Sequence, residues 1–257
     1  MFNMAGYDIL GNIALMKFKR GTKATRKKKE ALVFLKTHQN VHTILEKAGK
    51  FSGRLRTNKT KFIAGIKTRE ALYKENGCVF RFDVEKCYFS PRLSSERSEL
   101  AQMTKRGENV LVMFGGVAPF AVVIAKTGKP ARVVSVELGK IPSNYAEMNV
   151  KANKVNVEVV QGDVKRVLPK LKEKFGRVVM ARPNLKDDFL ACAFSAIKKF
   201  GTLHYYGFYD EDKFDEMKEL IEKRAKEAGK KIKIIRIKKA GDVGVRKYRF
   251  RVDVKVL

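Results

Sequence analysis

From about residue 107 onward, short apolar runs typical of β-strands alternate with segments typical of helices. The predicted strands are 110–114, 132–137, 155–161, 177–180 and 201–208. The predicted helices lie near 117–127, 142–153, 163–175 and 186–199. A charged helix at 211–228 precedes two last strands, 231–239 and 247–256. Because buried strands separated by helices form βαβ units, this region predicts a mostly parallel α/β sheet with an antiparallel C-terminal hairpin at its edge.

The first 86 residues are strongly basic and lack this long alternation. Residues 7–18 predict two short strands around a glycine turn, and 41–51 predict a short helix that ends near Gly49. The second half of the basic run 17–29, together with the EALVFLK that follows it, predicts a helix with one basic face. Asn76 and Gly77 predict the type I′ turn of a hairpin over 71–84. We therefore expect a small basic α+β domain at 1–86 and an α/β domain at 87–257.

The charge balance points to a polyanionic partner. Lys and Arg number 56 and Asp and Glu 27, which gives a formal net charge of +29. Such a charge predicts nucleic acid, and less readily an anionic membrane surface. No apolar run approaches the roughly 18 residues that a spanning helix needs, and the start lacks the pattern of a signal peptide. Three cysteines without a CxxC motif favour a reducing cytoplasm and exclude a zinc ribbon.

The ends of the first three strands of the α/β region carry the signature of a nucleoside pocket. The first strand ends in MFGGVAPF, the second in Glu137, twenty-two residues after Gly115, and the third in QGDV with Asp163. A glycine turn lets a ligand approach the backbone, an acid suits two ribose hydroxyls, and a second acid can accept from an adenine amino group. The expected cofactor contacts here are Phe114, Gly115, Val117, Glu137, Leu138, Asp163 and Val164.

Each of these signals also has a purely structural explanation. Two glycines after a strand are common in α/β proteins, and an acid at a strand end is often a helix cap. Their order and spacing favour the pocket. Neither GxGxxG nor GxxxxGK[ST] occurs, so S-adenosylmethionine is favoured over NAD and ATP.

Several segments resemble the archaeal and eukaryotic tRNA (guanine-37, N1)-methyltransferase family. They are YDILGNIAL, HTILEKAGKFSGRLR (42–56), KENGCVFRFDVEKCYFSPRL (74–93), YFSPRLSSER (88–97), MFGGVAPF, 134–164 and GTLHYYGF (201–208). The resemblance covers nearly the whole chain. It implies a class I methyltransferase (Rossmann-like) fold behind a small RNA-contacting domain. Longer relatives carry a further N-terminal domain for the tRNA elbow, and a match that begins near residue 7 leads us to expect the short form.

The resemblance also implies roles for individual residues. Glu96 would be the general base that removes the proton from guanine N1, and Arg56 would stabilise the charge that develops on O6. Arg92 would shape the pocket for cofactor and guanine, and Tyr88 and Phe89 would offer aromatic surface to them. The alternative for Glu96 is a capping acid beside a solvated Arg97, and for Arg56 it is one more phosphate contact.

The expected partner is the anticodon stem-loop of tRNA. The protein is expected to be a monomer and to have no membrane partner. The expected RNA contacts are Lys27, Lys28, Lys29 and Arg54. His38 and His42 are interpreted as surface or RNA-contacting residues, so no metal site is predicted. The resemblance allows Mg²⁺ as an aid to catalysis, although no acidic cluster identifies a site for it.

Three positions depart from the pattern of the family. Val112 replaces an Asp, Ala118 replaces a Gly, and Ala181-Arg182-Pro183 replaces Asn-Leu-Pro. By the family motif, Ala181 and Pro183 are expected to contact the cofactor. The departures keep two alternatives open. One is a wybutosine-pathway enzyme that transfers a methyl or aminocarboxypropyl group to the same nucleotide, and the other is a non-catalytic RNA-binding homologue.

Overall fold

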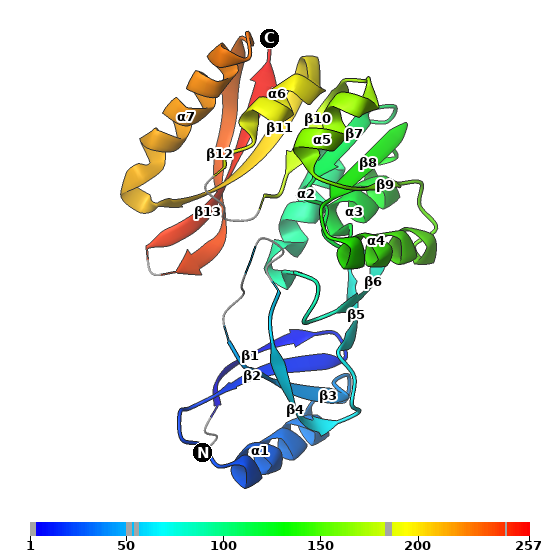
Figure 1. Ribbon diagram of the computed structural model, residues 1–257, viewed down its shortest axis with the longest axis vertical. Coiled ribbons are helices and arrows are strands. Elements are labelled where there is room, and N and C mark those ends of the chain that lie inside the picture. The colour runs from blue at the N-terminus through cyan, green and yellow to red at the C-terminus, as the bar shows by residue number, and fades with distance from the viewer. Residues whose placement is uncertain (1–3, 50–52, 54–56, 183–186, 245) are drawn as a thin grey trace. The chain divides into compact units, whose positions relative to one another are not determined.

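The computed structural model describes residues 4–49, 53, 57–182, 187–244 and 246–257. The chain divides between Pro91 and Arg92 into two compact units, called here the N-terminal unit and the C-terminal unit. Figure 1 labels their helices and strands. Each unit is described by itself.

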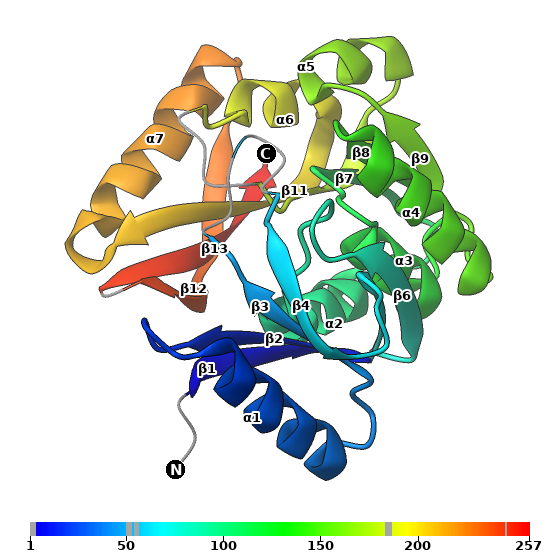
Figure 2. The ribbon, with the colours of Figure 1, turned by 60° about the horizontal axis from the view of Figure 1, so that its bottom comes forward.

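The N-terminal unit is built on a four-stranded sheet with the order β1-β2-β3-β4. Its strands are β1 (Met4–Leu10), β2 (Ile13–Phe18), β3 (Thr43–Lys47) and β4 (Thr60–Gly65). Helix α1 (Ala24–Thr37) connects the parallel pair β2 and β3 and lies along the sheet (Figure 2). Its Ala31 and Phe34 pack on Ala14 and Ile44. The predicted strand pair at 7–18 and the basic helix after it are confirmed.

The short helix predicted at 41–51 is wrong, because residues 43–47 form strand β3. Thr43, Ile44 and Leu45 are all buried, since β3 lies between β2 and β4 and is covered by α1. A central strand that is buried on both faces reads as a continuous apolar run, which periodicity does not separate from a helix. The β-branched Thr43 and Ile44 favour the strand.

Strands β5 (Glu70–Glu75) and β6 (Cys78–Asp83) form the predicted hairpin. Asn76 and Gly77 both have positive φ, at 47° and 68°. A type I′ turn needs positive φ at its two central residues, so the prediction is confirmed.

The C-terminal unit contains a seven-stranded sheet with the order β12-β13-β11-β10-β7-β8-β9. The strands are β7 (Asn109–Met113), β8 (Arg132–Glu137), β9 (Glu158–Gln161), β10 (Phe175–Met180), β11 (Ile197–Asp210), β12 (Ile232–Gly244) and β13 (Lys247–Val256). Strands β9, β8, β7, β10 and β11 run parallel, and β13 and β12 continue the sheet antiparallel. The predicted fold class, a mostly parallel sheet with an antiparallel edge hairpin, is confirmed.

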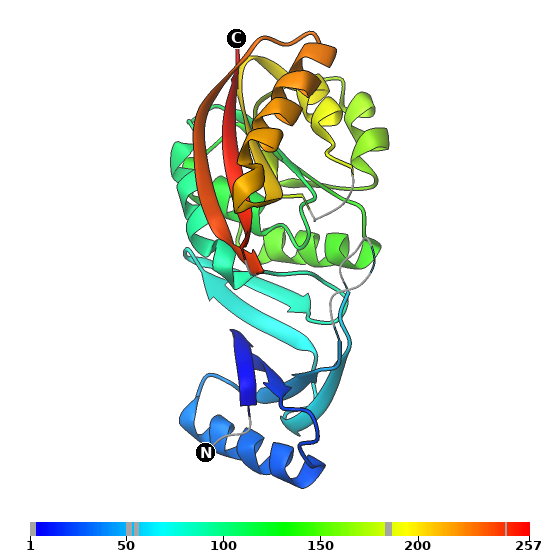
Figure 3. The ribbon, with the colours of Figure 1, turned by 90° about the vertical axis from the view of Figure 1, so that its left-hand side faces the viewer.

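Helices and 3₁₀ turns cover this sheet. They are η1 (Pro91–Leu93), α2 (Ser94–Met103), α3 (Pro119–Gly128), α4 (Lys140–Ala152), α5 (Val164–Val167), η2 (Leu168–Leu171), α6 (Leu190–Ala196), η3 (Glu211–Lys213) and α7 (Phe214–Glu227). Helices α6 and α7 pack on the core cluster of one sheet face, and Figure 3 shows α7 beside β12 and β13. Helix α2 packs against α3. Within the part of the chain that the structure describes, no helix is long and apolar enough to cross a membrane.

Two predicted helices are shorter than the pattern indicated. The helix expected at 163–175 is four residues of α5 followed by the 3₁₀ turn η2, because Pro169 lacks the N–H that a longer helix needs. The helix expected at 186–199 ends at Ala196, because Ile197 already pairs with Phe175 of β10.

Candidate active site

The turn after β7 is shaped by a close approach to the neighbouring strand. A Cβ at Gly115 would lie 2.1 Å from Ser135 Oγ on β8, so only glycine fits there. Phe114 and Ala118 have left-handed φ values of 61° and 63°. Ala118 stands where the family usually has glycine, and its left-handed backbone explains that preference. Strain of this kind in non-glycine residues is typical of functional turns.

Glu137 links this turn to the next one. Its Oε2 accepts from the Gly116 N–H at 2.8 Å, and its Oε1 accepts from the Gly139 N–H at 2.7 Å. Burial raises the pKa of Glu137, although the N–H groups of Gly139, Gly116 and Leu138 act in the opposite direction. No ion pair to Glu137 occurs among the described residues. A half-buried carboxylate with neutral partners suits hydroxyl ligands.

The register of the sheet brings the predicted pocket residues to one edge. Met113 pairs with Val136, and Glu137 pairs with Gln161, so the ends of β7, β8 and β9 coincide. Asp163 follows β9 and caps α5, with its Oδ1 accepting from the Lys165 N–H at 3.0 Å. Val117 and Val164 are buried, whereas Phe114 and Leu138, the other apolar residues expected to contact the cofactor, are half-buried.

The end of β10 carries a buried cation. Half-buried Ala181 follows the strand, and the guanidinium of buried Arg182 lies 5.8 Å from the Tyr205 ring and donates to the Asp187 carbonyl at 2.9 Å. Pro183 lies outside the described residues. Val112, the third departure from the family, is buried in the middle of β7.

Glu96 lies in the first turn of α2 and is buried, with 3% of its side chain exposed. Its Oε2 accepts from Tyr206 Oη at 2.9 Å and from an Arg251 Nη1 at 2.8 Å. Its Oε1 lies 2.8 Å from Lys238 Nζ. The alternative of a capping acid beside a solvated arginine is wrong. Arg97 is 1% exposed, its guanidinium lies 5.7 Å from the Phe120 ring, and α2 has no side-chain cap.

The sheet register also locates Glu96. Tyr205 pairs with Met180, which pairs with Met113, so Tyr206 lies level with the residues that follow β7 and β10. The Tyr206 ring is 5.9 Å from Phe120, the second residue of α3 after the glycine turn. The buried carboxylate and the glycine turn therefore share the carboxyl edge of the sheet.

A chain of buried ions runs from Glu96 toward the opposite edge of the sheet. Arg251 contacts Asp253, whose Oδ1 accepts from His204 at 2.6 Å, and His204 contacts Arg177. Arg177 ends the chain with a 3.0 Å bond to Glu108. This cluster was not predicted from the sequence. A signal was present in β13, where uncharged residues alternate with Lys247, Arg249, Arg251, Asp253 and Lys255, which places five charges on one face.

His204 makes the stability of the protein depend on pH. Burial lowers the pKa of His204 below its ordinary 6.5, with Arg177 and Arg251 acting in the same direction and Asp253 against it. The neutral ring donates from Nδ1 and accepts from Arg177 at Nε2. As the pH falls below 6.5, His204 is protonated in the unfolded chain but stays neutral in the folded protein. We expect the free energy of unfolding to decrease by up to about 1.4 kcal/mol per pH unit between about pH 6.5 and pH 5.

Denaturant unfolding across that range checks the prediction. The matched variant His204→Gln cannot titrate and is expected to lose this slope. Equal slopes in the two proteins would assign the pH dependence to other groups.

The predicted residues of the N-terminal unit have different surroundings. Arg56 and Arg54 lie outside the described residues. Tyr88 is half-buried, whereas Phe89 is 7% exposed and stacks on Phe82 at 4.6 Å, so Phe89 packs its own unit instead of offering surface. In the C-terminal unit, Arg92 is exposed in the turn η1.

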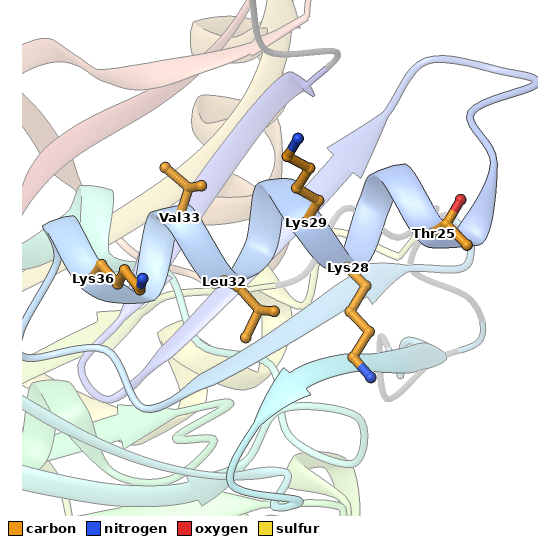
Figure 4. A pocket seen from close by; sticks show the side chains of 6 residues that line it. All are labelled: Thr25, Lys28, Lys29, Leu32, Val33 and Lys36. Carbon is orange, nitrogen blue, oxygen red and sulfur yellow. The ribbon is translucent and has the colours of Figure 1, made fainter.

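The lysines of α1 divide into two kinds. Lys27 pairs with Glu46 and lies 5.4 Å from the Phe18 ring, so it faces the sheet. Lys28 and Lys29 are exposed and extend from the outer surface of the helix (Figure 4). They line a shallow hollow together with Thr25, Leu32, Val33 and Lys36. Among the described residues, no group of three or more His, Cys, Asp or Glu side chains could hold a metal ion.

Comparison with known proteins agrees with this geometry. Residues 71–235 match the TRM5/TYW2 methyltransferase domain. The chain is 34% identical to tRNA (guanine(37)-N(1))-methyltransferase Trm5b of Pyrococcus abyssi, over 99% of this chain and 76% of the relative. It is 31% identical to tRNA (guanine(37)-N(1))/4-demethylwyosine(37)-methyltransferase Taw22 of Nanoarchaeum equitans, over 98% and 99%.

The solved structures agree as well. The crystal structure of Trm5b from P. abyssi superimposes with a TM-score of 0.87 at 33% identity, covering 98% of this chain and 75% of that one. The strand-end turns, the buried glutamate of α2 and these matches lead to one conclusion. The chain belongs to the TRM5/TYW2 methyltransferase family.

Proposed function

We propose that the protein transfers the methyl group of S-adenosylmethionine to N1 of guanine-37 in tRNA. The observation that carries the proposal is Glu96, a buried carboxylate fixed at the same sheet edge as the glycine turn. Similarity to Trm5b of P. abyssi supports the choice of nucleotide. The net charge of +29 supports an RNA substrate.

The residues at the carboxyl edge fit S-adenosylmethionine. Gly115 lets the turn after β7 pack closely against Ser135 of β8. Glu137 accepts only from neutral N–H groups, an environment that suits hydrogen bonds from ribose hydroxyls. Asp163, which follows β9 at the same edge, would accept from the adenine amino group. The sulfonium supplies a methyl group that is already activated for transfer, so the protein mainly holds donor and acceptor in line.

Guanine N1 carries a proton at neutral pH, and a general base must take it. Glu96 would accept that proton as N1 forms its bond to the methyl carbon and the carbon–sulfur bond breaks. Arg56 would donate to O6, where negative charge develops as the proton leaves. Arg92 and Tyr88 would shape the pocket for the base. The nucleotide must first leave its stack, at a cost of a few kcal/mol.

The outer surface of α1 is proposed to contact the phosphates of the anticodon stem-loop. Lys28 and Lys29 are the candidates, because both are exposed. Lys27 is a weaker candidate than its neighbours, since its ammonium already pairs with Glu46. Phosphate contacts of this kind make binding dependent on salt.

Methyl transfer to tRNA transcripts that differ only at position 37 tests the proposal. We expect transfer to transcripts with guanine at this position and none to transcripts with adenine. Equal transfer to both would contradict the assignment, because the methyl group would then lie elsewhere. The absence of S-adenosylmethionine binding in calorimetry would instead favour a non-catalytic RNA-binding homologue.

A second candidate reaction is methylation of 4-demethylwyosine at the same position. It is favoured by the similarity to Taw22 of N. equitans, because this chain matches 99% of the length of that enzyme at 31% identity. A tRNA that carries 4-demethylwyosine at position 37 is assayed beside the guanine transcript. Methyl transfer to only one of the two substrates indicates a single activity, and transfer to both indicates that the protein has both activities.

A further inference from the structure

The two oxygens of the Glu96 carboxylate have unequal surroundings. Oε2 accepts from Tyr206 Oη at 2.9 Å and from Arg251 Nη1 at 2.8 Å. The two donor residues are 1% and 0% exposed. Oε1 lies 2.8 Å from Lys238 Nζ, and a third of the Lys238 side chain is exposed. One oxygen is therefore held by buried groups, and the other faces a cation near the surface.

The donors on Oε2 are fixed by the sheet itself. Tyr206 belongs to β11 and Arg251 pairs with it directly in the neighbouring strand β13. Arg251 also contacts Glu99 at 2.7 Å and Asp253 at 3.0 Å, so its guanidinium is held on several sides. Burial, followed by the charge of Glu96, raises the pKa of Tyr206 well above its usual value, which keeps its hydroxyl a donor. Two donors satisfy both lone pairs of Oε2.

Lys238 has a second carboxylate within reach. Its ammonium also pairs with Glu99, one helical turn after Glu96 in α2. The hydrogen bond from Arg251 is the main cause that lowers the pKa of Glu99 to about 2, with Lys238 adding to it against burial. Glu99 therefore stays ionised, and Lys238 can leave Oε1 without losing its partner.

We propose that Tyr206 and Arg251 are positioning residues that hold Oε2, and that Oε1 accepts the proton of guanine N1 after Lys238 has left Oε1 and kept only Glu99 as its partner. This inference rests on the proposed function. In the step, the N1–H bond breaks and an O–H bond forms on Oε1, while the electron pair of N1 forms the bond to the methyl carbon. The carbon–sulfur bond of S-adenosylmethionine breaks at the same time, and its electron pair stays on the sulfur of the departing thioether. Lys238 keeps its proton throughout. Before guanine binds, its ammonium occupies the position next to Oε1 that the N1–H edge of guanine takes in the reaction.

The inference predicts opposite effects for two variants that each remove one partner of the same carboxylate. Tyr206→Phe removes only the hydroxyl and keeps the ring on Phe120. We expect the single-turnover rate of methyl transfer to fall about tenfold to a hundredfold, with the Kd values for tRNA and S-adenosylmethionine retained. Tyr248→Phe removes a hydroxyl from β13 that has no described contact with Glu96, and it is the control expected to match the parent.

Lys238→Met removes the ammonium that competes with guanine for Oε1 of Glu96. We expect the single-turnover rate divided by the Kd for tRNA to rise about two- to fivefold over the value for Lys233→Met. Lys233 is exposed on the same strand, so this control corrects for the lost charge. If the cluster were purely structural, Tyr206→Phe and Lys238→Met would both lower the free energy of unfolding of the protein. The two variants would then not change the rate of methyl transfer in opposite directions.

Four outcomes separate the inference from the function it rests on. A Tyr206→Phe protein as fast as the parent, or a Lys238→Met value at or below that of Lys233→Met, overturns the inference while the parent still methylates guanine. If the parent does not methylate guanine, the proposed function fails and the inference fails with it. If Glu96→Gln is as active as the parent, Glu96 is not the base, and the inference fails although the parent methylates guanine.

Discussion

Glu96→Gln is expected to lower the single-turnover rate of methyl transfer by about 10²- to 10⁴-fold, the range that general-base catalysis contributes. Gln has nearly the same shape as Glu but cannot take the N1 proton. The fold is expected to persist, because Arg251 keeps Glu99 and Asp253 as partners. Rapid mixing of enzyme with S-adenosylmethionine and limiting tRNA, followed by quenching, measures the rate.

Glu108→Gln is the matched control for this experiment. It neutralises a carboxylate at the other end of the same buried ion chain, bonded to Arg177. We expect it to lower the melting temperature and leave the single-turnover rate within about twofold of the parent, since general-base catalysis is not affected. If the two variants lost rate equally, Glu96 would be a structural residue and not the base.

Glu137→Ala is expected to weaken S-adenosylmethionine binding by about a hundredfold, because charge-assisted bonds to two ribose hydroxyls would be lost. The variant also removes the acceptor for the Gly116 and Gly139 N–H groups, which loosens both turns. Isothermal titration calorimetry measures the change. The Kd for tRNA is expected to stay near that of the parent.

Glu147→Ala controls for the loss of a negative charge near the same helix. Glu147 is exposed on α4, the helix that follows Glu137 and β8 in the chain. Its cofactor affinity should equal that of the parent. An unchanged affinity of Glu137→Ala for S-adenosylmethionine would show that this carboxylate does not bind the ribose. It would also contradict the assigned cofactor pocket.

The sheet of the C-terminal unit could be predicted because its strands are separated by helices and bounded by turns. The runs at 132–137 and 247–256 match β8 and β13 to the residue. The predictions that were wrong fall where local pattern is ambiguous. Thr43–Lys47 is a strand because β2, β4 and α1 surround it, and these contacts come from residues far away in the sequence.

The candidate site was predictable only in its local parts. Gly115, Glu137 and Asp163 stand at strand ends, and the order of strands alone brings them to one edge. The surroundings of Glu96 were not predictable, because its partners Tyr206, Lys238 and Arg251 lie 110, 142 and 155 residues further along the chain. Only the pairing of β11, β13 and β12 beneath α2 assembles them.

The central claim is that this chain methylates N1 of guanine-37. Incubation of a guanine-37 tRNA transcript with the protein and S-adenosylmethionine, followed by nuclease digestion and mass spectrometry, tests it most directly. We predict N1-methylguanosine in the fragment that contains position 37, and its loss when Glu96→Gln replaces the parent. An unmodified position 37, or one that carries an aminocarboxypropyl group, would contradict the account.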